Sequence, residues 1–114
     1  MTEPARETLI QLTRDLDTAP VECDGMARLV TTRLTKAGIP HQVEAGRLDT
    51  PNGPIAPHFW VRCGPWVIDY RVRLWVGEGD GVPHGVVGQG DWQYLGEPVA
   101  MPALPDAIFD LLRC

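Results

Sequence analysis

The sequence lacks three features that mark large functional classes. No apolar run approaches the length needed to cross a membrane. Basic residues are in deficit, with a formal net charge of -5, and the arginines are scattered, so no basic face for phosphate binding is expected. The three cysteines include no pair at the short spacing of a zinc or redox motif. We therefore expect no membrane association, no nucleic-acid partner, and no metal or other cofactor.

A secretory signal is also missing from the pattern of the first residues. The segment Met-Thr-Glu-Pro-Ala-Arg-Glu has no basic region followed by an apolar stretch. With an odd number of cysteines, this favours a reduced, cytoplasmic protein, and export without a cleaved signal stays an open alternative. At 114 residues, 44% of them hydrophobic, the chain suits a single domain over residues 1–114.

The apolar pattern predicts helices first and strands afterwards. Apolar residues at helical spacing predict one amphipathic helix over 5–16 and a second over 23–37, which Gly38 and Pro40 end. Gly25 weakens the second helix but permits close approach of another segment. We expect strands at 42–48, 58–63, 66–75, 86–87 and 92–95, a turn-rich stretch at 49–57, and a short helix at 104–112. This order predicts an α+β domain with an antiparallel sheet.

The hairpin around Gly64-Pro65 carries the first polar constellation. If Cys63 pairs with Trp66, the residue numbers of each opposed pair in the hairpin add up to 129. Because side chains alternate along a strand, His58 and Asp69 then share one sheet face and become diagonal neighbours within side-chain reach. Such a carboxylate can orient an imidazole. The plain alternatives are a structural histidine and an Asp69 that pairs with Arg71 or Arg62.

Cys23 completes the constellation at the expected start of the second helix. The helix dipole and the unpaired N–H groups there favour a thiolate and can stabilise an oxyanion. If the helix packs on the sheet face that bears His58, the sulfur, imidazole and carboxylate converge. Cys23 is then the nucleophile, His58 the general base and later acid, and Asp69 the orienting group. The plain alternative for Cys23 is a small buried apolar residue.

These residues resemble the motifs of transglutaminase-like proteins, in the order Cys, His, Asp. Cys23-Asp-Gly-Met-Ala27, followed by Gly38-Ile39-Pro40, resembles the nucleophile segment of that family. His58-Phe-Trp60-Val61 resembles its His-x-Trp-Val strand, and Trp66-Val67-Ile68-Asp69 its Trp-Val-x-Asp strand. The resemblance covers residues 21–72. One departure is Tyr70, where many relatives have proline after the aspartate.

The resemblance implies a papain-like core, in which a Cys-bearing helix packs on an antiparallel sheet carrying His and Asp. It also implies cysteine-dependent chemistry on a peptide or protein amide, as a peptidase, deamidase or acyltransferase, through a thioester. Two alternatives stay open: a catalytically inactive binding or adaptor module, and a toxin or effector domain with the same triad.

Several other residues are candidates for roles around this site. Trp60 and Trp92 are candidates to line a substrate groove, with core packing as the alternative. His84 is an alternative base if its loop folds over Cys23, and His41 is expected in a surface turn. Cys63 faces away from His58 and is expected in the core. Gln11 and Gln89 are candidates, as amides, for a second oxyanion donor.

Overall fold

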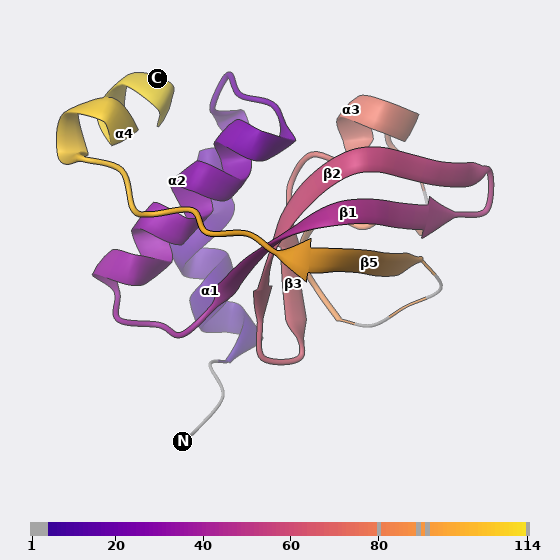
Figure 1. Ribbon diagram of the computed structural model, residues 1–114, viewed down its shortest axis with the longest axis horizontal. Coiled ribbons are helices and arrows are strands. Elements are labelled where there is room, and N and C mark those ends of the chain that lie inside the picture. The colour runs from indigo at the N-terminus through magenta and orange to yellow at the C-terminus, as the bar shows by residue number, and fades with distance from the viewer. Residues whose placement is uncertain (1–4, 80, 89, 91, 114) are drawn as a thin grey trace.

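The computed structural model describes residues 5–79, 81–88, 90 and 92–113, and shows a small α+β domain. Its elements in chain order are α1 (Arg6–Thr13), the 3-10 helix η1 (Arg14–Thr18), α2 (Cys23–Lys36), β1 (Gln42–Thr50), β2 (Gly53–Cys63), β3 (Trp66–Asp69), α3 (Arg73–Val76), β4 (Gly85–Val87), β5 (Gln93–Pro98) and α4 (Asp106–Arg113). In Figure 1, α1, α2 and α4 gather on one side, and the β1–β2 hairpin projects away from them. No helix in the described ranges is long and apolar enough to span a membrane.

The helix α2 begins and ends where the sequence predicts. Its apolar residues recur at helical spacing and are buried: Met26, Leu29, Val30 and Leu34. Gly38 ends the helix with a φ of 72°, a left-handed conformation that glycine adopts without a Cβ clash. The first predicted helix is divided instead, because the chain tightens into η1 at Arg14.

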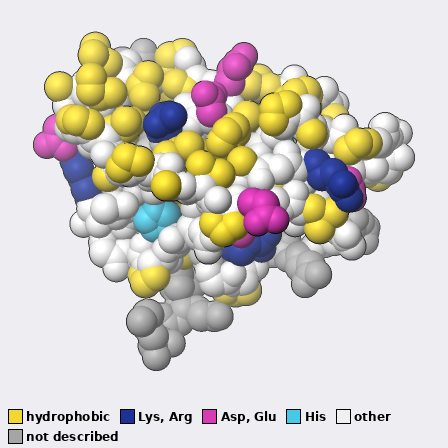
Figure 2. Space-filling view, in the orientation of Figure 1, with side chains coloured by type: hydrophobic (Ala, Val, Ile, Leu, Met, Phe, Trp, Pro, Cys, Tyr) yellow, Lys and Arg dark blue, Asp and Glu magenta, His cyan; other side chains and the backbone are white. Residues whose placement is uncertain are grey.

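The C-terminal helix α4 lies against α2. Phe109 is its buried residue, and the Arg33 guanidinium of α2 lies 5.3 Å from the centre of the Phe109 ring. Ile108 and Leu111 stay exposed on α4. Hydrophobic side chains gather over this part of the molecule in Figure 2.

Five antiparallel strands form one sheet in the order β4-β3-β2-β1-β5. Between β2 and β3, Cys63 pairs with Trp66 and Val61 with Ile68, which confirms the predicted hairpin register. Gly64 takes a φ of 58° in the turn, which again suits glycine.

The predicted turn-rich stretch at 49–57 is wrong, because these residues belong to the β1–β2 hairpin. Thr50 pairs with Gly53 and Asp49 with Pro54, so the turn is confined to residues 51 and 52. Prolines at 54 and 57 argue against a central strand because they lack an N–H group. Here β3 pairs only with residues 61–63 of β2, so the prolines lie where β2 has no second neighbour.

The predicted strand at 66–75 is also too long, since β3 ends at Asp69. The Asp69 carboxylate accepts a hydrogen bond from the Arg71 backbone N–H at 3.0 Å, and this local bond competes with continued strand pairing. The chain then turns into the short helix α3. Leu74 and Trp75 on α3 are 67% and 50% exposed. These two apolar residues, which favoured a longer strand, are therefore not core residues.

The sheet curls so that β5 faces β3. In a flat sheet these strands, with β2 and β1 between them, would lie about 14 Å apart. Instead the Tyr94 hydroxyl of β5 donates to Asp69 of β3 at 2.9 Å. The Tyr94 ring also meets Trp60 edge to face, with 4.9 Å between ring centres. The concave face of this curl carries the polar residues of the site.

The main core lies between the helices and the convex face of the sheet. Its strand residues include Val43, Val61, Cys63 and Ile68. A smaller cluster of Leu48, Ile55 and Val72 lies apart from it. The apolar stripe of α2 therefore packs on the face opposite His58, and the expected packing on the His58 face is wrong.

Candidate active site

His58 and Asp69 lie on the same face of the β2–β3 pair and form a direct hydrogen bond. The His58 Nε2 atom is 2.7 Å from Asp69 Oδ2, and the two side chains are 0% and 1% exposed. This is the diagonal contact that the register predicts. Neither Arg71 nor Arg62 takes the carboxylate with its guanidinium: Arg62 Nε donates to Glu44, and Arg71 binds another segment.

The Asp69 carboxylate is held by two further donors. Its Oδ1 atom accepts the Arg71 backbone N–H, and its Oδ2 atom accepts the Tyr94 hydroxyl. Burial and the neighbouring carboxylate raise the pKa of Tyr94, so the phenol stays a donor. With three partners, the carboxylate has a fixed orientation toward the imidazole.

Cys23 is the first residue of α2 and is partly exposed. The Glu22 side chain does not cap the helix, and the first intrahelical bond runs from Met26 N–H to the Glu22 carbonyl at 2.8 Å. Within the described residues, the N–H groups of positions 23 to 25 therefore have no helical acceptor. They are available to an anion beside the sulfur.

The second nitrogen of His58 and the residue Cys23 are the remaining parts of the candidate site. His58 Nδ1 is buried and has no hydrogen-bond partner among the described residues. Burial lowers the pKa of His58, but the interactions with Asp69 and with Cys23 outweigh it and raise the pKa to about 9. Cys23 is thus a neighbour that acts on the imidazole, and among the described residues its sulfur forms no hydrogen bond with His58. Such loose contacts are common in enzymes without substrate.

The early end of β3 determines which segment the Arg71 side chain holds. The predicted register would have placed Arg71 across from His58, but β3 stops at Asp69. The segment before Cys23 is fixed there instead, since Arg71 Nε donates to the Val21 carbonyl at 2.7 Å. A Cβ added to Gly25 would lie 2.7 Å from Val21 Cβ, so glycine allows this segment to fold back on α2.

A shallow groove runs beside the start of α2. Its volume is about 480 Å³. It is lined by residues of the segment before Cys23 and by residues that follow β3, among them Pro20, Glu22, Arg73, Leu74 and His84. Cys23 follows Glu22 directly in the chain, but neither Cys23 nor His58 lines this groove.

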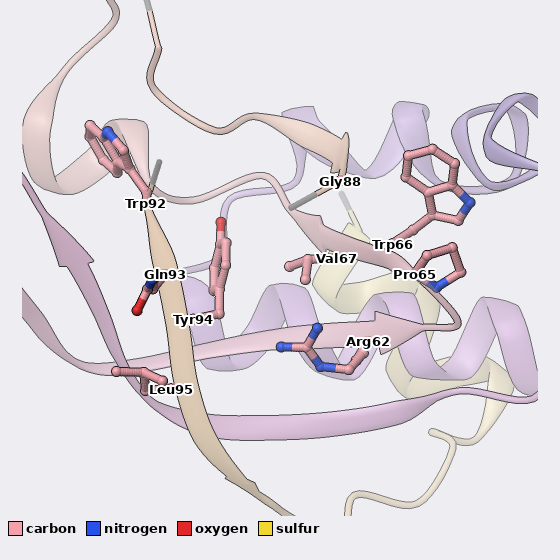
Figure 3. Close-up of a pocket in the computed structure, with 9 residues that line it drawn as sticks. All are labelled: Arg62, Pro65, Trp66, Val67, Gly88, Trp92, Gln93, Tyr94 and Leu95. Atoms are coloured by element: carbon pink, nitrogen blue, oxygen red, sulfur yellow. The ribbon is translucent and has the colours of Figure 1, made fainter. Parts of the chain in front are cut away.

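A second cavity of about 620 Å³ opens on the concave face of the sheet. Figure 3 shows the Tyr94 ring between Trp92 on one side and Val67 and Arg62 on the other. Trp92 thus lines a cavity, whereas Trp60 is 1% exposed and donates from Nε1 to Glu44 at 2.8 Å. A direct contact of Trp60 with a substrate is not compatible with this burial. Neither Cys23 nor His58 lines the cavity.

The other candidate residues lie away from the nucleophile or outside the described part. His41 bonds Thr31 near the far end of α2, and Cys63 is buried in the core as expected. His84 does not fold over Cys23; its Nε2 atom lies 3.0 Å from Asp17 Oδ2. Gln11 is exposed on α1, and Gln89 lies outside the described residues.

Sequence reasoning missed two residues that hold the site. These are Tyr94, whose hydroxyl donates to Asp69, and Arg71, whose guanidinium holds the segment before Cys23 rather than the Asp69 carboxylate. The contact of Tyr94 with Asp69 depends on the curl of the sheet, and that of Arg71 on the early end of β3. The curl of the sheet has no local sequence signal, whereas the early end of β3 has a weak one, an aspartate whose side chain can bond the N–H two residues on.

No family model matches the chain, and no curated protein and no solved structure is significantly similar to it.

Proposed function

We propose that the protein is a cysteine-dependent enzyme that acts on peptide or protein amides, with Cys23 as nucleophile, His58 as base and acid, and Asp69 as the orienting residue. One observation carries the proposal: His58 bonds Asp69 through Nε2, its buried Nδ1 has no hydrogen-bond partner among the described residues, and Cys23, at a helix start, is among the groups that raise the pKa of His58. An imidazole with one nitrogen fixed by a carboxylate and the other beside a thiol is the arrangement of a nucleophile–base pair.

The chemistry follows from these groups. The Cys23 thiolate attacks the amide carbonyl carbon, and the N–H groups at the start of α2 stabilise the oxyanion. As the intermediate collapses, the C–N bond breaks, His58 gives its Nδ1 proton to the leaving amine, and a thioester remains. Water or a second amine then attacks the thioester, His58 takes a proton from it, and the thiolate returns. The products are an acid, or a new amide, and the released amine.

The papain-like, transglutaminase-like assignment is part of the same proposal. Its support is the motif order together with a helix that starts at Cys23 and packs on an antiparallel sheet bearing His58 and Asp69. The pKa of His58, about 9, supports a charged imidazolium at neutral pH, which pairs with a thiolate.

The test begins with alkylation by iodoacetamide near neutral pH, with modified residues mapped by mass spectrometry. Cys23 should react faster than Cys114, and faster than Cys23 in the urea-unfolded protein. Casein and monodansylcadaverine then separate the reactions: new peptide ends indicate a peptidase, ammonia without incorporation a deamidase, and incorporated dye an acyltransferase. Cys23→Ser is the control and should abolish each signal.

A folded wild-type protein whose Cys23 reacts no faster than in urea would contradict the proposal and favour the binding or adaptor alternative. Reactive Cys23 with growth arrest on expression, absent in Cys23→Ser, would support the toxin alternative with the same triad.

A further inference from the structure

The Arg71 side chain is almost completely buried, 6% exposed for the residue, and all its donor groups are used. Its Nε donates to the Val21 carbonyl, and its two terminal nitrogens donate to the Tyr70, Asp17 and Ala19 carbonyls and to the Asp17 carboxylate, at 2.7 to 3.0 Å. A guanidinium offers five N–H donors in a fixed fork, and here five contacts match them. This is the most extensive side-chain network among the described residues.

The network joins the two parts of the candidate active site. On one side, the Arg71 backbone N–H donates to Asp69 Oδ1, beside the His58 contact. On the other side, the guanidinium holds residues 17 to 21, and Cys23 follows two positions later. Arg71 therefore connects the strand that carries the carboxylate with the segment that delivers the nucleophile.

The position of Cys23 needs such a connection, because the packing of α2 does not supply it. The apolar stripe of α2 lies on the convex face of the sheet, whereas His58 lies on the concave face. Among the described residues, no side chain caps the start of α2. The hydrogen bonds of Arg71 are thus the directional contacts that set where the helix start lies relative to His58.

We propose that Arg71 is a positioning residue that places the Cys23 sulfur against His58 Nδ1, an inference that rests on the proposed function. Arg71 touches neither reacting group; it acts through the backbone of residues 17 to 21. Lysine cannot replace it, because a single ammonium cannot reach four carbonyls and a carboxylate along these separate directions.

The test compares Arg71→Lys with wild type in the alkylation of Cys23 by iodoacetamide, at neutral and at alkaline pH. Displacing the sulfur from the imidazolium should lower the neutral rate about tenfold, since misplacements near 1 Å have large effects on aligned groups. The alkaline rate should stay the same, because a thiol that is ionised by high pH needs no imidazolium. The measured quantity is the ratio of the two rates, which a uniform loss of access would not move.

Arg33→Lys is the matched control. Arg33 also bridges two helical segments, from α2 to the Leu12 carbonyl and the Asp15 carboxylate, but it lies away from Cys23. It should lower the melting temperature and leave the rate ratio unchanged. If Arg71→Lys folds and keeps the wild-type ratio, or if Arg33→Lys lowers the ratio equally, the positioning role is wrong.

Asp17→Ala is the second test variant, to be used if Arg71→Lys does not fold. It removes one contact to the guanidinium from a side chain that is 38% exposed, and should lower the ratio about threefold. An unchanged ratio in this folded variant would overturn the proposal. If Cys23 of the wild-type protein is itself unreactive, the proposed function fails and the role of Arg71 fails with it. If wild-type Cys23 is reactive but the Arg71 substitution does not change the rate ratio, only the positioning role is contradicted.

Discussion

Two histidine–aspartate pairs make the same kind of contact but differ in how deeply they are buried. His58 and Asp69 are 2.7 Å apart with side chains 0% and 1% exposed, whereas His84 and Asp17 are 3.0 Å apart with side chains 20% and 38% exposed. Each histidine also has a buried Nδ1 without a hydrogen-bond partner among the described residues.

The difference lies in what surrounds each pair. The His58 imidazole interacts with Cys23, and Asp69 is fixed by Tyr94 and by the Arg71 backbone. His84 has the Tyr70 ring against it at 5.4 Å and no cysteine, and Asp17 is shared with the Arg71 guanidinium. A histidine–aspartate contact is thus not in itself a sign of catalysis; under the proposed function, the neighbouring Cys23 is what distinguishes the His58 pair.

The pH dependence of stability should separate the two pairs most strongly. The folded pKa of His58, about 9, lies above the ordinary 6.5, so the native state binds the proton more tightly. This stabilisation is complete below about pH 6.5 and is lost as the pH rises through about 9. It amounts to about 3 kcal/mol in the free energy of unfolding, by linkage. Urea unfolding of wild type and His58→Gln across this range measures the difference.

His84→Gln is the control for this measurement. The free energy of unfolding of His84→Gln should decrease with rising pH as it does in the wild type. In His58→Gln this decrease should be largely absent. Equal slopes in wild type and His58→Gln would mean that the His58 pair does not hold a proton in the folded protein.

The reactivity of Cys23 should show the next largest contrast. We expect His58→Gln to lower the neutral alkylation rate of Cys23 about thirtyfold, because the thiolate loses its imidazolium partner. His84→Gln should change the rate less than threefold. A larger loss in His84→Gln than in His58→Gln would exchange the roles of the two histidines and revive His84 as the base.

The part of the site that is predictable from sequence is the part set by short-range pattern. Alternation along 58–63 and 66–69 fixes the faces of His58 and Asp69, and a two-residue turn fixes their register. The helix start at Cys23 follows from the apolar spacing and from Gly38 at the other end.

What escapes prediction depends on competition between local and distant contacts. Trp66 to Trp75 has strong strand propensity, yet the Asp69 carboxylate captures the Arg71 N–H and ends the strand. The curl that brings Tyr94 across to Asp69 arises from the whole sheet. The packing of α2 on the convex face was missed because alternation defines two sheet faces but does not say which one a helix covers.

Tyr94→Phe gives the smallest expected effect and tests whether the surroundings of Asp69 matter to the His58 pair. The substitution removes one donor from Asp69 Oδ2 and keeps the ring against Trp60, so the protein should lose about 1 kcal/mol of stability. A carboxylate with fewer donors attracts the imidazolium more strongly, and the pKa of His58 should rise.

Tyr70→Phe is the matched control, because the Tyr70 hydroxyl is buried and lies 2.8 Å from Thr13 Oγ1, away from Asp69. It should cost similar stability and leave the titration of His58 unmoved. The histidine ring signals in NMR spectra at increasing pH report both results. If neither variant changes the titration midpoint of His58, Tyr94 supports only the packing of the curled sheet. The two pairs then differ only in their burial and in the presence of Cys23.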